Sequence, residues 1–164
     1  MSAKRSTPSP EIRQLLAIMD AAYDRTSWHG TNLRGSVRRV TAQQAAWRPG
    51  GDRHSIWELV VHAAYWKYIG RRRLTGAKKG SFELDGSNFF TREDRGEKAW
   101  KADVALMDRM HAELRAEVEK LSARDLVRIP PGSKVSNFAL LSGVAAHDLY
   151  HAGQIQLLKR LAPK

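Results

Sequence analysis

The sequence contains no cysteine among its 164 residues. Disulfides, thiolate metal ligands and a cysteine nucleophile are therefore excluded, and any bound metal must use imidazole or carboxylate ligands. The chain also lacks an apolar run of roughly 18 residues or more, the length that a membrane span requires. Its first ten residues include no apolar run typical of a signal peptide. We therefore expect a cytoplasmic protein with no membrane partner.

Acidic residues are scarce relative to basic ones: 17 Asp and Glu face 28 Lys and Arg, which gives a net charge of +11. Such a charge attracts phosphates and acidic small molecules, so nucleic acid has to be considered. However, we find no helix-turn-helix and no aromatic sheet motif. The basic runs Arg71–Arg73 and Lys78–Lys79 follow an expected helix, where cations complement the helix dipole. We do not expect nucleic-acid binding, and the charge can instead steer an acidic small-molecule substrate.

Patterns typical of strands are also absent, whereas helical spacing and capping signals recur along the chain. Ser9 and Pro10 begin a helix that we expect to reach about Arg39, and the capping box of Ser55 and Glu58 begins a second that ends before Gly76. A third is expected over about 97–121 and a fourth from Ser136 or Asn137 to about 161. These patterns predict an all-α protein, with residues 1–9 as a mobile tail and 10–162 as a single four-helix-bundle domain.

Two segments between the expected helices are predicted to be connections. Residues 41–51 contain a possible capping box, Thr41 with Gln44, but their proline and glycines favour a connector. Residues 76–96 hold four glycines and form a connection longer than most in compact domains. This second segment is predicted to be either a crossover between the two ends of the bundle or a lid. Its three phenylalanines indicate that it packs against the protein.

Three histidines lie on predicted inward faces of two helices. His147 and His151 are four residues apart, so their side chains are one helical turn from each other and can chelate one ion. Both fall on a continuous apolar stripe of the fourth helix, and His62 falls on the apolar stripe of the second. Buried imidazoles need partners. A metal ion bound by His62, His147 and His151 is one explanation, and core histidines that are hydrogen-bonded to neighbours are the other.

Other polar and aromatic residues are weaker candidates for the site. His29 falls on the expected inward face of the first helix, where it could carry a proton as a catalytic residue or simply pack. His111 is interpreted as a core residue further along the bundle. Glu58 could orient His62, but its place in a capping box favours the cap. Four aromatic residues could line a pocket, although a core position is the simpler interpretation: Tyr65, Trp66, Trp100 and Tyr150.

The motifs Trp47-Arg48-Pro49, His54 to His62 and His147-Asp148-Leu149-Tyr150-His151 resemble those of the DinB-like family of metalloenzymes. The resemblance runs from about residue 11 to 161. It implies an up-down-down-up bundle, with 76–96 as the crossover between the second and third helices, and a divalent metal on His62, His147 and His151. It also implies a homodimer. Characterised members include thiol S-transferases and an isomerase that use bacillithiol or mycothiol, so a low-molecular-weight thiol is a candidate cofactor.

Three imidazole ligands with an open fourth position are typical of a catalytic zinc site. An ion held in this way makes a bound water or thiol easier to deprotonate, which would supply the nucleophile that the cysteine-free chain lacks. Zinc, nickel and iron(II) all accept imidazole, so the sequence does not select among them. The sequence therefore predicts a metal-dependent enzyme of the transferase or hydrolase type. The alternatives are a bundle with a structural metal that binds partners and, ranked lower, a basic nucleic-acid-binding module.

Overall fold

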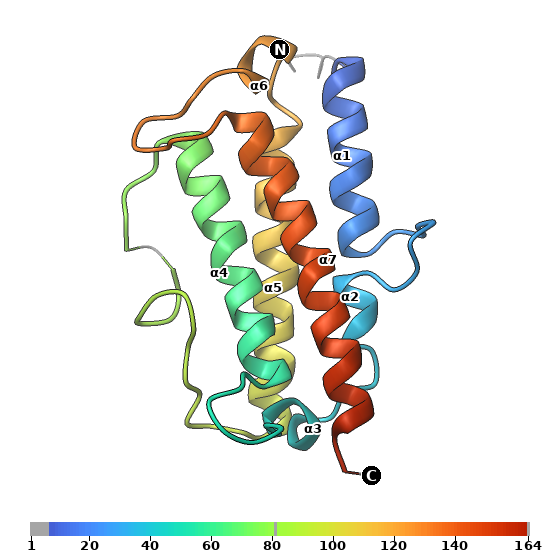
Figure 1. Ribbon diagram of the computed structural model, residues 1–164. Helices are drawn as coiled ribbons and strands as arrows, with labels where there is room; N and C mark the ends of the chain where they lie inside the picture. The colour runs from blue at the N-terminus through green and yellow to red at the C-terminus, as the bar shows by residue number, and fades with distance from the viewer. Residues whose placement is uncertain (1–6, 81, 164) are drawn as a thin grey trace.

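The computed structural model describes residues 7–80 and 82–163, and the described part of the chain is all-helical. Four long segments of the chain lie side by side as a bundle (Figure 1). The longest helices are α4 (Ile56–Thr75), α5 (Glu97–Val118) and α7 (Asn137–Leu161). The fourth position is shared by α1 (Pro10–Tyr23) and the short α2 (Leu33–Ser36). The predicted four-helix bundle is confirmed, while most of the predicted tail falls outside the described residues.

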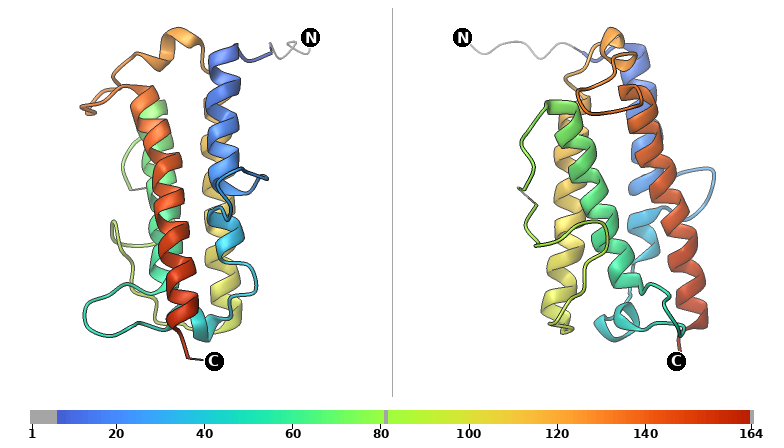
Figure 2. Two further views of the ribbon diagram at one scale, coloured as in Figure 1. Left: turned by 45° about the vertical axis from the view of Figure 1, so that its right-hand side comes forward. Right: turned by 60° about the vertical axis from the view of Figure 1, so that its left-hand side comes forward.

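The direction of the helices follows an up-down-down-up order (Figure 1). Helices α4 and α5 are parallel neighbours, and α1 and α7 run the opposite way. Parallel neighbours need a connection that returns along the full length of a helix. The segment between α4 and α5 does this, running down the outside of that pair (Figure 2). Phe90 of this segment is buried and Phe82 and Phe89 are partly buried, so the predicted packing of the crossover is confirmed.

The prediction of one long first helix reaching Arg39 is wrong. Helix α1 ends at Tyr23, and a loop separates it from α2. Polar side chains in this loop form hydrogen bonds with backbone groups that would otherwise bond within a helix. Ser27 Oγ donates to the carbonyl of Gly30, and Asn32 caps α2 by accepting from the Gly35 N–H. The apolar spacing nevertheless continues across the break, because α2 packs on α7 in line with α1. Periodicity alone therefore could not reveal the interruption.

The predicted capping signals decide where the other helices begin. Ser55 and Glu58 form the capping box of α4, which ends at Gly76 in the left-handed conformation. Ser136 caps α7. Thr41 and Gln44 form a real capping box on the short α3 (Ala42–Ala46), and a second unpredicted turn forms α6 (Ala123–Leu126). None of the described helices combines the length and apolar character needed to cross a membrane.

Candidate metal centre

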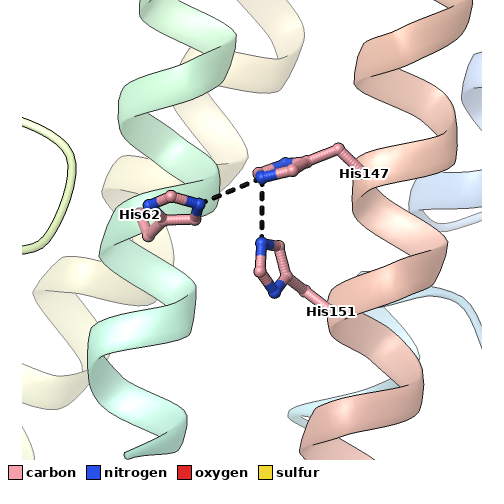
Figure 3. A group of neighbouring side chains, drawn as sticks. All are labelled: His62, His147 and His151. Atoms are coloured by element: carbon pink, nitrogen blue, oxygen red, sulfur yellow. Dashed lines mark hydrogen bonds between the residues drawn. The ribbon is translucent and has the colours of Figure 1, made fainter. Parts of the chain in front are cut away.

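The three predicted metal ligands meet inside the bundle. His62 comes from the first half of α4, whereas His147 and His151 come from successive turns of α7 (Figure 3). His147 Nε2 lies 3.0 Å from His62 Nε2 and 2.9 Å from His151 Nε2. His62 and His151 are 6% and 4% exposed, so the group is largely shielded from solvent. The helix packing thus brings together two segments that are 85 residues apart in the sequence.

Two of the rings are held in a definite tautomer by their outer nitrogens. His62 Nδ1–H donates to the backbone carbonyl of Asn88 at 2.9 Å, and His151 Nδ1–H donates to Gln154 Oε1 at 2.6 Å. Because an amide oxygen can only accept, each Nδ1 carries a proton. In the neutral ring the lone pair is then on Nε2, the atom that faces His147. Both rings are therefore oriented as metal-ligating imidazoles usually are.

Burial keeps these rings neutral. It lowers the pKa of His147 to about 3, with a further contribution from the neighbouring His151 and His62, and lowers the pKa of His151 to about 4. The pKa of His62 is also lowered by burial, although the Asn88 carbonyl opposes this change. Neutral imidazole is the form that binds metal ions. At neutral pH the group does not have to lose protons before it accepts a cation.

The three histidines do not have enough protons to satisfy one another's Nε2 atoms by hydrogen bonds. A neutral His147 can carry one proton on Nε2, so it can donate to only one of the two lone pairs that face it. The other lone pair is then left without a donor, which is unfavourable in a buried site. A cation among the three Nε2 atoms satisfies all of them at once. The residues present therefore fit a bound metal ion.

The spacing of the three nitrogens also suits a metal ion. All three ligand atoms lie within 4.8 Å of one another. Tetrahedral zinc with Zn–N distances of about 2.0 to 2.1 Å places its ligand nitrogens about 3.3 Å apart, so small side-chain rotations would accommodate the ion. Among the described residues no carboxylate or fourth histidine joins the group. Three protein ligands with an open position are typical of catalytic rather than structural zinc sites.

Aromatic rings support His62 from the crossover side. Phe89 stacks on His62 with ring centroids 4.1 Å apart, and its other face carries His54 at 3.6 Å. Asn88, next to Phe89, adopts a left-handed backbone conformation with φ of 64°. Its carbonyl accepts from His62 and its side chain accepts from Trp66 Nε1–H at 3.0 Å. The crossover therefore orients the candidate ligand His62 and the indole of Trp66 beside it.

His29, the predicted catalytic assistant, is not brought to the metal centre. It is exposed in the loop between α1 and α2, with Nδ1 3.4 Å from Ser27 Oγ, and does not belong to the histidine group. Its expected place on an inward helical face is wrong because α1 ends at Tyr23. A catalytic role for His29 stays a prediction without support from this geometry. Glu58 belongs to the capping box of α4, as expected: its carboxylate accepts from the Ser55 N–H, and also from Arg48.

The remaining candidates are divided between core and surface. His111 is buried and stacks on Tyr23 with ring centroids 3.7 Å apart, which confirms its interpretation as a core residue. Trp100 is also in the core, where Nε1–H donates to the Val40 carbonyl. Tyr150 is 64% exposed and Trp66 lines a groove beside the histidines.

Sequence reasoning missed the residues that hold the ligands in place. Gln154 lies three residues after His151 on the same helix, so helical spacing could have identified it as a partner. Asn88 acts through its backbone carbonyl from a long connection, and no sequence pattern indicates such a contact. Lys67 and Asp148, an ion pair between α4 and α7, were also not predicted.

A helical bundle with a buried histidine group on two facing helices defines the class of protein: an all-α protein with a candidate metal centre. The family model of the DinB superfamily matches residues 7–155. The chain therefore belongs to the DinB superfamily, as the motifs around the three histidines predicted. No curated protein and no solved structure gave a significant match.

Proposed function

We propose that this protein is a metal-dependent enzyme in which His62, His147 and His151 hold one divalent ion. The observation that carries the proposal is the convergence of three neutral Nε2 atoms, two of them with the opposite ring nitrogen already engaged. When bound, such an ion supplies Lewis acidity that makes a coordinated water or small-molecule thiol a nucleophile near neutral pH. The reaction class that follows is transfer to a thiol or hydrolysis.

The residues of the chain would contribute orientation and shielding. The Asn88 carbonyl and Gln154 hold the rings of His62 and His151 so that their lone pairs point inward. Phe89 covers one face of His62 and excludes water from that side. Electrostatic interactions are stronger in such a partly desolvated site than in bulk water. The open side, beside Trp66, is where a substrate would approach.

The alternative of a structural metal in a binding protein has less support from the geometry. Structural zinc sites are usually closed by four protein ligands, and the described residues offer three. The nucleic-acid alternative rests on the net charge of +11 alone, and some of the basic side chains are already paired within the protein. Examples are Arg34 with Asp108 and Arg92 with Asp103.

The proposal is tested first by metal content and then by turnover. Protein purified without a nickel column should contain, or take up, close to one divalent ion per chain by elemental analysis. The metal-loaded protein is then offered electrophiles together with bacillithiol, mycothiol, glutathione or water, in parallel with His151→Ala. Activity that is lost in the variant supports the proposal. Absence of metal after zinc is added, or equal activity in the variant, would overturn it.

A further inference from the structure

A groove of 420 Å³ opens directly onto the candidate metal centre. His62 and His147 form part of its lining, Trp66 and Asn88 border it, and the rest comes from α7 and the segment just before it. Groove and histidines are therefore contiguous, and a molecule lying in the groove would have one end at the open side of the metal centre.

The lining of this groove is apolar although the chain carries a net charge of +11. Within the described part of the chain, its lining includes no Lys, Arg, Asp or Glu, and Leu140, Val144 and Val135 supply aliphatic surface. A neighbouring hollow that shares Trp66 and Asn88 is different, since basic side chains such as Arg72 line it. The absence of charge is thus a property of the groove beside the histidines, not of this whole side of the protein. Apolar surface of this kind favours uncharged ligands, because a charged group would lose hydration without gaining a partner.

Two features keep the groove open and ordered. Trp66 is fixed by its hydrogen bond to Asn88 Oδ1, so the indole is oriented before any ligand arrives. On the opposite wall α7 carries Gly143, and a Cβ added there would meet no atom within 4 Å. The glycine therefore leaves space at the position where most side chains would project into the groove.

We infer that this groove is the specificity site for the substrate and that it takes an uncharged, apolar molecule carrying one metal-binding atom at its end. The inference rests on the proposed function, since the metal centre would hold that atom. The apolar body would lie between Trp66 and the Gly143 face of α7. Trp66, Gly143 and Val144 are then the residues that select the substrate.

The test uses the zinc-loaded protein and three hydroxamate probes that share a metal-binding group. Hexanohydroxamic acid carries an apolar tail, acetohydroxamic acid carries almost none, and succinic monohydroxamate carries a charged tail. Calorimetric titration should show hexanohydroxamic acid binding about tenfold more tightly than acetohydroxamic acid, because its extra methylene groups leave water. The charged tail should give no such advantage.

Gly143→Leu and Gly153→Leu are a matched pair of variants. Both glycines lie in α7, and at both an added Cβ meets nothing within 4 Å, so neither change should disturb the fold. Of these two glycines, Gly143 lines the groove and Gly153 does not. The preference for the longer probe should fall to within about twofold in Gly143→Leu and persist in Gly153→Leu, because only the first leucine occupies the space of the tail. Equal sedimentation of both variants would exclude altered association as the cause.

The outcomes separate this inference from the proposed function. A protein that binds no zinc, or binds zinc but none of the probes, refutes a catalytic metal centre and the groove with it. A protein that binds zinc and acetohydroxamic acid but shows no preference for the apolar tail keeps the proposed function and overturns the groove alone. A preference that survives in Gly143→Leu would likewise place the tail elsewhere.

Discussion

The ammonium group of Lys67 and the carboxylate of Asp148 pair inside the bundle, where 0% and 2% of their side chains are exposed. Lys67 belongs to α4 and Asp148 to α7, the two helices that carry the three histidines of the candidate metal centre. Burial lowers the pKa of Lys67 and raises the pKa of Asp148. The charge of each partner acts in the opposite direction and favours the ionised form of the other. Because Asp148 directly follows His147, the pair also fixes how the two helices face each other.

Removing one partner of this pair should destabilise the protein strongly. Lys67→Met leaves a buried carboxylate without a counter-charge, which typically costs about 3 to 5 kcal/mol of the free energy of unfolding. Urea unfolding followed by circular dichroism measures the loss. The double variant Lys67→Met with Asp148→Leu should regain much of it, because two apolar side chains can replace a buried pair. A single variant as stable as the parent would show that the pair does not link the helices.

Each histidine of the group should be necessary for tight metal binding. His62→Ala, His147→Ala and His151→Ala leave two imidazoles, which hold a divalent ion less firmly than three. Zinc affinity is measured by competition with a chromophoric chelator. His29→Ala is the matched control, because it also removes a histidine but from an exposed loop outside the group. Unchanged affinity in any of the first three variants would remove that residue from the site.

Gln154 should tune the affinity of the site without touching the ion. Gln154→Leu removes the acceptor of His151 Nδ1–H, and loss of such a partner typically lowers metal affinity by about 10- to 100-fold. Gln154→Glu should retain or raise the affinity, because a carboxylate also accepts this hydrogen bond. Gln156→Leu is the control on the same helix, since Gln156 contacts Thr31 rather than a histidine. The idea fails if the two leucine variants bind zinc equally.

His111 should make the fold sensitive to mild acid. Burial, with the nearby charges of Lys67 and Arg115, lowers its pKa to about 3. The unfolded chain therefore binds a proton at His111 between about pH 6.5 and 3 that the folded protein does not. The stabilising effect of the neutral ring is complete above this window and is lost as the pH falls through it.

The sensitivity can be assigned to His111 by substituting a ring that does not titrate. His111→Phe keeps a ring beside Tyr23 and removes a buried Nδ1 that has no hydrogen-bond partner in the described structure. Between pH 4 and 6, the free energy of unfolding should fall less steeply in this variant, by up to about 1.4 kcal/mol per pH unit. Urea unfolding at several pH values measures both slopes. Parallel slopes would mean that His111 titrates normally in the folded protein.

The local features of the fold were readable from the sequence because they depend on near neighbours. The capping box of Ser55 and Glu58 predicted the start of α4, and the start of α7 was predicted at Ser136 or Asn137, of which Ser136 is the cap. The four-residue spacing of His147 and His151 places both rings on one helical face whatever the rest of the chain does. The inward position of His62 followed from the apolar residues on its own helix.

The three-dimensional packing decided what depends on residues far apart in the chain. It brought His62 to His147, placed the Asn88 carbonyl behind His62, and buried Lys67 against Asp148. The apolar pattern also did not show that α1 ends at Tyr23, because a break between α1 and α2 keeps the same apolar spacing as an unbroken helix. Helical periodicity reports which face of a segment is apolar. It does not report which helices become neighbours or which backbone carbonyl a buried imidazole will meet.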